Sequence, residues 1–341
     1  MKKSIQKYLL YIVLFICLAT VFICTTIGVA DISVSQTIEI LFNKITGVGN
    51  IEGVKTSTVA IIWTLRFPRV LLAFLVGGAL SICGVAYQGI FKNPMADPFL
   101  LGVSSGAALG ATIAIVFHLS ATFLGFDLIS IFAFVSALLT LLLVYNISRV
   151  GNKVPVTTLL LSGIAISQVL TAIISMFMIF SDQMNKIVFW TMGSFNAKSW
   201  NHLLVVLPYV VIGFMILYHY HRQMDIMLLG EDTASQLGVN TDRLKLIILV
   251  VTALITAAAV SVTGIIGFVG LIIPHIVRML VGPKHKNLYP YSFVLGGVLL
   301  IICDTVARSL ISQEIPVGII TSIFGGPFFI YLLKQRKRGG I

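Results

Sequence analysis

Long apolar segments, separated by short polar or charged ones, follow one another along almost the whole chain. Most are about 20 residues long, the length of helix that crosses the roughly 30 Å hydrocarbon core of a bilayer. They lack the strict alternation of apolar and polar residues that marks membrane β-strands. The pattern therefore predicts an all-α polytopic membrane protein with about ten transmembrane helices. The predicted spans lie near residues 8–30, 70–91, 99–118, 128–148, 156–180, 201–221, 244–263, 265–282, 291–308 and 315–333.

Glycine interrupts or shortens two of these segments, the third and the eighth. Such segments are typical of helices that neighbours cover or that line a transport pathway. In the third span, Gly102, Gly106 and Gly110 recur every four residues and so share one face of a helix. We expect this face to pack closely against another helix, because small residues let two backbones approach each other.

Composition supports a lipid environment for the chain. Of its 341 residues, 58% are hydrophobic and only 10% are charged, and the mean hydropathy is +1.03. A soluble domain has roughly 25% charged residues. This balance argues against a soluble globular protein and predicts a single transmembrane domain over residues 1–341.

Basic residues decide the expected orientation. The net charge is +11, but the lysines and arginines are scattered at span ends and form no stripe, which argues against nucleic-acid binding. Cytoplasmic loops carry an excess of Lys and Arg, and ten spans put both termini on one side. Both termini are therefore predicted to be cytoplasmic, as they also would be with eight spans. The basic residues at the two ends are Lys2, Lys3, Lys7, Lys334, Arg336, Lys337 and Arg338.

No set of residues typical of catalysis or metal binding stands out in the sequence. His275 has no second metal ligand at helical spacing, and the four cysteines lie inside apolar segments. The segment 47–56 resembles a phosphate-binding loop, but Val54 stands before Lys55 where that motif requires glycine. We therefore expect no catalytic residues, metal or cofactor, and no nucleotide-hydrolysing site in this chain.

One face of the fifth predicted span is polar. Ser167, Thr171 and Ser175 are spaced i, i+4 and i+8, and Gln168 lies beside them. Two interpretations remain open: hydrogen bonds between helices, which we favour, or the wall of a hydrated transport pathway.

The largest inner segment, about residues 222–243, predicts a short helix in the loop. Glu231 and Asp232 suit the positive N-terminal end of that helix, and Ala234 and Leu237 supply a small apolar face. Gly238 can take the left-handed conformation that ends a helix. The helix either simply connects two spans or forms a rigid contact with a cytoplasmic partner.

A pair of arginines marks the outer border of the second span. Arg66 and Arg69 lie in the sequence Leu-Arg-Phe-Pro-Arg just before it, and the sequence Asn-Pro-Met-Ala-Asp-Pro of residues 93–98 follows it. Arginines at such a border can anchor the chain in lipid headgroups. Arg308, at the end of the ninth span, lies at the same border, four residues after Asp304.

With these segments the chain resembles the FecCD-type permeases, the membrane subunits of ABC importers for iron siderophores, haem and cobalamin. The resemblance covers most of the chain in order, and the matching segments are highly specific when taken together. They are Leu65–Arg69, Gly84–Ala108, Gly230–Gly238, Gly267–Arg278 and Asp304–Pro327.

The resemblance implies ten helices per subunit, a second identical or different permease subunit, two cytoplasmic ATPase subunits and an extracytoplasmic substrate-binding protein. It assigns Arg66, Arg69 and Arg308 to docking of the binding protein, through pairs with acidic residues. It assigns the loop around Gly230–Gly238 to coupling with the ATPase. It also makes Ser167, Gln168, Thr171 and Ser175 candidates for the transport path.

The resemblance predicts import of an iron chelate, a ferric siderophore, across the cytoplasmic membrane, with haem or cobalamin as the alternatives. A remoter alternative is an ion-coupled secondary transporter, which is disfavoured because the acidic residues lie mostly at span ends. Low arginine and abundant isoleucine, lysine and asparagine suggest an AT-rich bacterial genome.

Overall fold

The structure is a computed structural model that describes residues 2–28, 30–48, 53–119, 121–123, 126–151, 154–310 and 314–338. Residues 49–52 of the loop-like segment 47–56, and residues 311–313 of the predicted outer connection before the last span, lie outside the described residues. Helices make up nearly all of the described chain, and the only two strands described there, β1 and β2, pair in an antiparallel hairpin of two residues each.

The bounds of the elements follow the predicted spans closely, with short helices added between them. In chain order the elements are α1 (Lys2–Thr26), α2 (Val34–Thr46), α3 (Thr56–Ala60), the π-helix η1 (Ile61–Arg66), α4 (Phe67–Ile90), the 3-10 helix η2 (Pro98–Leu101), α5 (Val103–Val116), β1 (Thr122–Phe123), β2 (Phe126–Asp127), α6 (Leu128–Ser148), α7 (Val156–Phe180), α8 (Met184–Thr191), α9 (Trp200–His219), α10 (His221–Met227), α11 (Glu231–Gln236), α12 (Thr241–Thr263), α13 (Val269–Val281), α14 (His285–Ser309) and α15 (Val317–Arg338).

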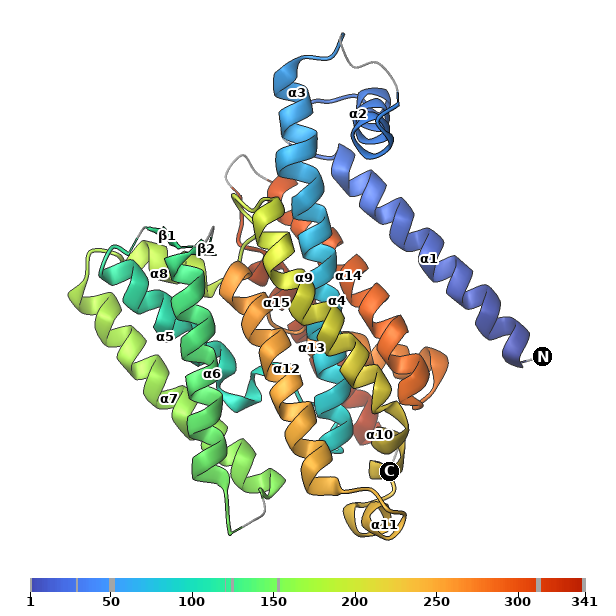
Figure 1. The fold of residues 1–341 in the computed structure, drawn as a ribbon, viewed down its shortest axis with the longest axis vertical. Helices are drawn as coiled ribbons and strands as arrows, with labels where there is room; N and C mark the ends of the chain where they lie inside the picture. The colour runs from blue at the N-terminus through green and yellow to red at the C-terminus, as the bar shows by residue number, and fades with distance from the viewer. Residues whose placement is uncertain are drawn as a thin grey trace.

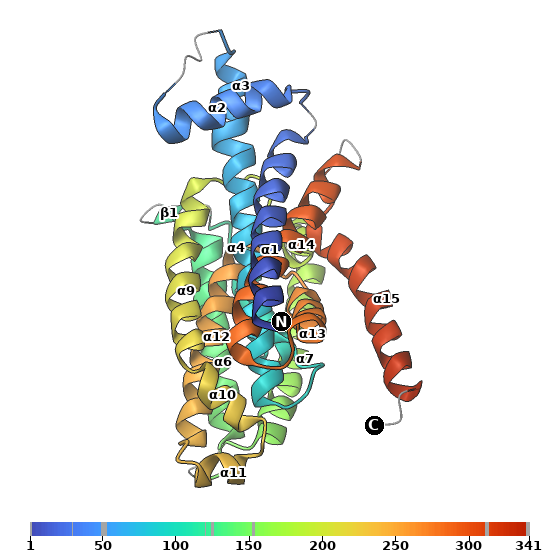
Figure 2. The ribbon, with the colours of Figure 1, turned by 90° about the vertical axis from the view of Figure 1, so that its right-hand side faces the viewer.

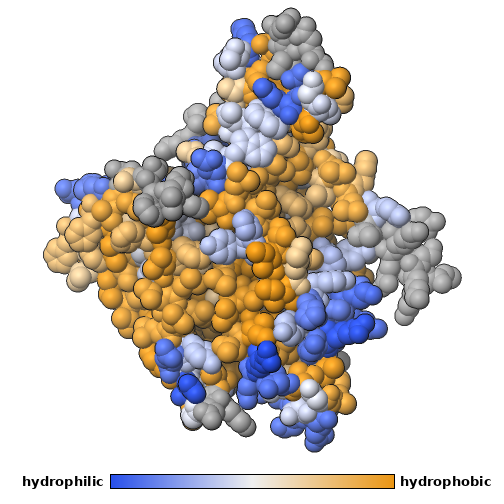
Figure 3. Space-filling model, viewed as in Figure 1, coloured by the Kyte–Doolittle hydropathy of each residue, from blue (hydrophilic) through white to orange (hydrophobic). Residues whose placement is uncertain are grey.

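Each predicted span corresponds to one helix. Among the described residues, six helical stretches are long and apolar enough to cross a membrane, and four shorter apolar helices occupy the first, third, eighth and tenth predicted spans. Figure 3 shows a broad hydrophobic belt across the middle of the molecule, with hydrophilic residues gathered mainly toward the two ends. The all-α polytopic fold predicted from the sequence is confirmed.

The connections sort to two opposite ends of the molecule. Figure 1 shows α2, α3, the β-hairpin and α8 toward one end, called here the α2 end, and α11 at the other, called the α11 end. Figure 2 shows the same separation from the side, with α2 lying across the top of the bundle. This alternation agrees with the predicted sorting of the loops to two sides of a membrane.

The helix α4 is the centre of the bundle. It is buried along nearly its whole length and packs against α14, α13, α9 and α12. Its contact with α14 is close because glycines face each other: a Cβ on Gly77 would lie 2.2 Å from the Gly296 carbonyl oxygen. Close backbone approach gives dense packing without large side chains, as is common between membrane helices.

A second close contact joins α5 to α6. A Cβ on Gly106 would lie 2.2 Å from Thr140 Oγ1, and one on Gly110 would lie 2.2 Å from the Phe132 carbonyl oxygen, so the predicted packing role of these two glycines agrees with the structure. Gly102 is also closely packed, since a Cβ there would lie 3.2 Å from Ser167 Oγ and 3.3 Å from Thr140 Cγ2, but it has φ +75° and forms the turn between η2 and α5 instead of lying within α5.

Replacing Gly106 with alanine is expected to destabilise the protein by about 1–3 kcal/mol, because the added methyl group overfills the α5–α6 contact. The change is measurable as a lower melting temperature in detergent. Gly326→Ala is the matched control, since a Cβ at Gly326 would meet no atom within 4 Å. Equal melting temperatures for the two variants would contradict the expectation.

Two helices begin at some distance from the predicted span boundaries. The helix that contains the second span begins at Thr56, well before residue 70, because α3, η1 and α4 form one continuous helix of 35 residues. At 1.5 Å per residue this helix exceeds the hydrocarbon thickness, so its first turns extend beyond it at the α2 end. The eighth span begins at Val269 rather than 265, since a segment without helical hydrogen bonding, residues 264–268, separates α12 from α13.

Candidate functional site

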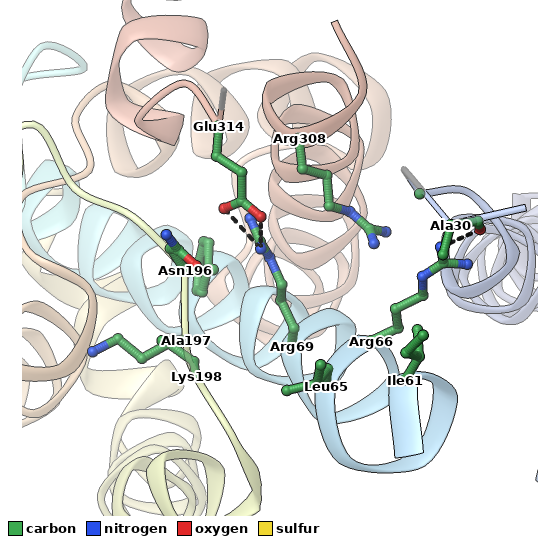
Figure 4. Close-up of a pocket in the computed structure, with 12 residues that line it drawn as sticks. Ala30, Ile61, Leu65, Arg66, Arg69, Asn196, Ala197, Lys198, Arg308 and Glu314 are labelled. Carbon is green, nitrogen blue, oxygen red and sulfur yellow. Dashed lines mark hydrogen bonds and ion pairs between the residues drawn. The ribbon is translucent and has the colours of Figure 1, made fainter. Parts of the chain in front are cut away.

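Three arginines from two helices meet in one pocket at the α2 end. Arg66 ends η1, Arg69 lies in the first turn of α4 and Arg308 in the last turn of α14. All three line a pocket of about 280 Å³, together with Ala30, Glu314 and residues 195–198. Figure 4 shows the three guanidinium groups around this pocket. The close packing of α4 on α14 is what brings together residues that are far apart in the sequence.

Arg69 is held by two carboxylates on different edges of its guanidinium group. Its Nε and Nη2 donate to Asp304, with distances of 3.0 Å from Nε to Oδ2 and 2.8 Å from Nη2 to Oδ1. Its Nη1 donates to both carboxylate oxygens of Glu314, at 2.9 and 3.0 Å. The side chain of Asp304 is 1% exposed and that of Glu314 is 34% exposed. Arg69 therefore bridges an inner and an outer carboxylate.

The other two arginines depend mostly on backbone oxygens. Arg66 donates to the carbonyl oxygen of Thr26 at 2.9 Å and to that of Ala30 at 2.6 Å. Arg308 donates to the Cys24 carbonyl oxygen and lies 3.8 Å from Asp304, the pair expected from their i, i+4 spacing. Carbonyl groups at the end of α1 and just after it thus position two guanidinium groups that carry positive charge into the pocket.

Lys198, which the sequence analysis missed, also lines this pocket. Figure 4 shows its amino group extending away from the three arginines. Burial lowers the pKa of Lys198 below its ordinary value, and the charge of Asp127 opposes that change. No local pattern marks the connection between α8 and α9 as part of this site, because only the fold brings it beside α4. The three arginines line the pocket although each is buried, with 6% of Arg66, 9% of Arg69 and 5% of Arg308 exposed.

At the α11 end, the predicted short helix is present as α11, from Glu231 to Gln236. Gly230 precedes it with φ +128° and Gly238 follows it with φ +84°, so both ends use backbone conformations that favour glycine. The Asn240 side chain caps α12 by accepting from the Arg243 N–H. The left-handed conformation of Gly238 agrees with the sequence analysis.

The apolar face predicted for α11 differs in the structure. Ala234 is fully buried against the body of the protein, whereas Leu237 is 59% exposed, so the two residues do not form one face. Glu231 pairs with Lys245 of α12, and Asp232 is exposed. Leu229, 66% exposed, adds a second apolar side chain at this end. The surface near α11 thus offers leucines to a partner while Ala234 anchors the helix.

A carboxylate links this end to the core. Asp225 of α10 accepts hydrogen bonds from the backbone N–H of His285 at 2.8 Å and from its Nδ1 at 2.7 Å. Burial acts to raise the pKa of Asp225, but the hydrogen bonds and charge of His285 outweigh it and lower the pKa below its ordinary value. The pair fixes α10, which leads into α11, to the first turn of α14.

The polar face of α7 is largely uncovered in the single chain. Gln168, Thr171 and Ser175 are exposed and Ser167 is half-buried. The hydroxyl of Thr171 donates to the Ser167 carbonyl oxygen and that of Ser175 to the Thr171 carbonyl oxygen. Both hydroxyls thus bond within α7, and among the described contacts neither Thr171 nor Ser175 makes the interhelical hydrogen bond that the sequence analysis favoured.

Within the described part of the chain, no group of three or more His, Cys, Asp or Glu side chains is placed to hold a metal ion. The four cysteines are buried and unpaired with one another, as expected for small apolar residues in spans.

Comparison with known proteins agrees with this architecture. Residues 15–335 match the model of the FecCD transport family. The cobalamin import system permease protein BtuC of Halobacterium salinarum is 44% identical over 84% of this chain and 76% of its own length. The hemin transport system permease protein HmuU of Yersinia pestis is 40% identical over 81% of this chain and 84% of its own length.

A solved structure shares the fold. It is described as an inward-facing conformation of a metal-chelate type ABC transporter, and it is 32% identical, with a TM-score of 0.83 over 96% of this chain and 99% of the other. The chain therefore belongs to the FecCD transport family, as a non-catalytic, multi-pass membrane permease subunit of an ABC importer.

Proposed function

We propose that this permease imports an iron chelate, a ferric siderophore, across the cytoplasmic membrane, driven by ATP hydrolysis on partner subunits. The observation that carries the proposal is the separation of two sites: the arginine pocket at one end and α11 at the other. The hemin relative and the metal-chelate type structure support a chelated metal as the cargo. Haem and cobalamin are the alternative cargoes, and the cobalamin relative favours the second. Membership of an ABC importer family sets aside the ion-coupled alternative.

In this proposal the arginine pocket faces outward and receives acidic side chains of the substrate-binding protein. Arg66, Arg69 and Arg308 suit that role because a guanidinium group is always charged and binds carboxylates through two parallel hydrogen bonds. Their convergence around one pocket supports a single docking point for each permease subunit. Both chain termini and α11 then lie on the cytoplasmic side.

The ATPase subunits bind at α11 in this proposal. Glycines with positive φ define both ends of the segment Gly230–Gly238, and the Glu231–Lys245 ion pair joins it to α12. A displacement of α11 by the ATPase would therefore also displace α12. Ala234 fixes the helix to the body, and Leu237 is free to contact the partner. The Asp225–His285 pair extends this connection to α14.

A second permease subunit, identical or different, completes the transport path. Only 11% of the apolar window of α7 is buried in the single chain, the lowest share among the six long helical stretches. Its exposed residues Gln168, Thr171 and Ser175 would then face the other subunit across a hydrated path, as polar side chains in a span commonly do. Ser167 lies at the inner edge of this face.

Uptake in a deletion strain tests the proposal. Deleting the gene is expected to abolish uptake of one labelled iron–siderophore complex, and supplying the chain restores it. Haem and labelled cobalamin are offered in parallel, and loss of only one of those would replace the siderophore with that cargo. Unchanged uptake of all three, in a strain without a redundant importer, would contradict the proposal.

The docking role has its own test in the same strain. Arg66→Glu is expected to reduce uptake at least about tenfold, because it places a negative charge where an acidic group must bind. Lys44→Glu, the same charge reversal at an exposed position of α2, is the matched control. Equal uptake by the two variants, at equal amounts in the membrane, would reject docking at this pocket.

A further inference from the structure

We propose that Glu314 is an internal competitor of the binding protein: in the free permease its carboxylate occupies the edge of Arg69 that a partner carboxylate takes on docking. The inference rests on the proposed docking role of the arginine pocket. It assigns a function to Glu314, which limits how fast and how tightly the two proteins bind.

The geometry of Arg69 is the first support. A guanidinium group has five N–H donors in a fixed plane, and here they serve two carboxylates on separate edges. Asp304 takes the Nε and Nη2 side, and Glu314 takes Nη1 with both of its oxygens, at 2.9 and 3.0 Å. Glu314 therefore makes the kind of contact that an acidic residue of a docking partner would make.

The two carboxylates differ in how replaceable they are. Asp304 is part of α14, its side chain is 1% exposed, and Arg308 also lies near it. Removing it would leave buried charges unpaired. Glu314 lies in the connection before α15, and its side chain is 34% exposed at the rim of the pocket. Of the two, only Glu314 can leave and be replaced from outside.

Displacing Glu314 requires little rearrangement of the chain. The backbone N–H of the next residue, Ile315, donates to the Ala307 carbonyl oxygen at 3.1 Å and holds this connection against the end of α14. The side chain can rotate away from Arg69 while that hydrogen bond remains. Figure 4 shows Glu314 and Arg66 on different sides of Arg69, so rotation of Glu314 leaves Arg66 and its hydrogen bonds to Thr26 and Ala30 unchanged.

Competition of this kind weakens docking without abolishing it. A partner carboxylate replaces one charge-assisted hydrogen-bonded pair with another, so the net gain at Arg69 is small. The negative charge of Glu314 also reduces the positive field that attracts an acidic partner to the pocket. A binding protein that must leave after each delivery benefits from such a limit on affinity.

Binding kinetics of the complete transporter test the inference. The permease with its ATPase subunits is held in lipid nanodiscs, and the probe is the substrate-binding protein from the same source, identified by capture on the wild-type complex and then purified. Glu314→Gln and Glu314→Ala are expected to bind this protein about fivefold more tightly than wild type, mainly through faster association at low salt. Asp182→Asn is the matched control, because Asp182 is exposed at the same end but does not line the pocket.

The outcomes separate the inference from the docking proposal on which it rests. If Glu314→Gln binds no more tightly than wild type or Asp182→Asn, while Arg66→Glu weakens binding, docking stands and the competitor role is overturned. Weaker binding by both Glu314 variants would instead make Glu314 a residue that positions Arg69. If neither Arg66→Glu nor Arg308→Gln changes binding, the docking proposal fails and the inference fails with it.

Discussion

Replacing Arg69 with methionine is expected to destabilise the permease by about 3–5 kcal/mol, because it leaves the buried carboxylate of Asp304 without its main partner. Asp304 is 1% exposed and accepts three hydrogen bonds from Arg69, and the more distant Arg308 does not replace them. The measurement is the apparent free energy of unfolding from a titration with sodium dodecyl sulfate in mixed micelles. The amount of folded Arg69→Met protein in the membrane is also expected to fall below that of wild type, but by a smaller factor than the unfolding equilibrium changes.

Two controls identify the cause of this loss. Arg66→Met removes hydrogen bonds to two carbonyl groups but strands no buried carboxylate, so its cost should be clearly smaller. Adding Asp304→Asn to Arg69→Met removes the stranded charge and should recover most of the stability. Equal unfolding free energies for Arg69→Met and wild type would show that the Arg69–Asp304 pair is not structural.

The Arg69–Asp304 pair also affects which variants can be used to test docking of the binding protein. A charge reversal at Arg69 would bring a third carboxylate to Asp304 and Glu314, so lost transport could reflect lost folding. Arg66 and Arg308 have no such double carboxylate contact among the described interactions. Both are themselves buried, so a docking measurement at either position is paired with a measurement of the melting temperature.

The second large effect, a loss of transport, is expected from a substitution at the α11 end. Leu237→Asp should reduce transport at least about tenfold while leaving the fold unchanged, because Leu237 is 59% exposed in the single chain and proposed to be buried against the ATPase. A charge placed in a desolvated contact is costly unless it finds a partner. The measurement is ATP-driven uptake into proteoliposomes, together with co-purification of the ATPase subunits.

Val150→Asp is the matched control for this variant. Val150 is 61% exposed in the connection between α6 and α7, which Figure 1 shows at the same end of the molecule. If Val150→Asp and Leu237→Asp reduce uptake equally, the effect is one of charge at this end and not of α11. Wild-type uptake and ATPase binding by Leu237→Asp would reject the coupling role.

Several features were predictable because their causes are local. A run of about 20 apolar residues needs no knowledge of its neighbours to favour a membrane helix, so each of the ten predicted spans falls on an apolar helix. Gly238 ended α11 as expected, since a left-handed glycine acts within a few residues. The border position of Arg66 and Arg69 followed from the same local pattern.

The failures share a different cause. The early start of this helix at Thr56 was missed because the sequence marked only the apolar segment from about residue 70, whereas η1 before it is helical in contact with α2. Leu237 and Ala234 were assigned to one apolar face, but contact with the body of the protein buries only Ala234. Helical periodicity gives the angle between two side chains, not which one meets a neighbour.

By itself, the sequence determined that this protein is a bundle of membrane helices, where its spans lie, and which family it resembles. Only the tertiary structure decided the partners of its charged groups. Arg69 pairs with Asp304 and Glu314, which lie 235 and 245 residues away along the chain. That choice depends on α4 packing against α14, and the helix contact results from the shapes of whole surfaces, which no short segment specifies. Burial then makes the pairing obligatory, because a charge removed from water must find its counter-charge among whichever helices surround it.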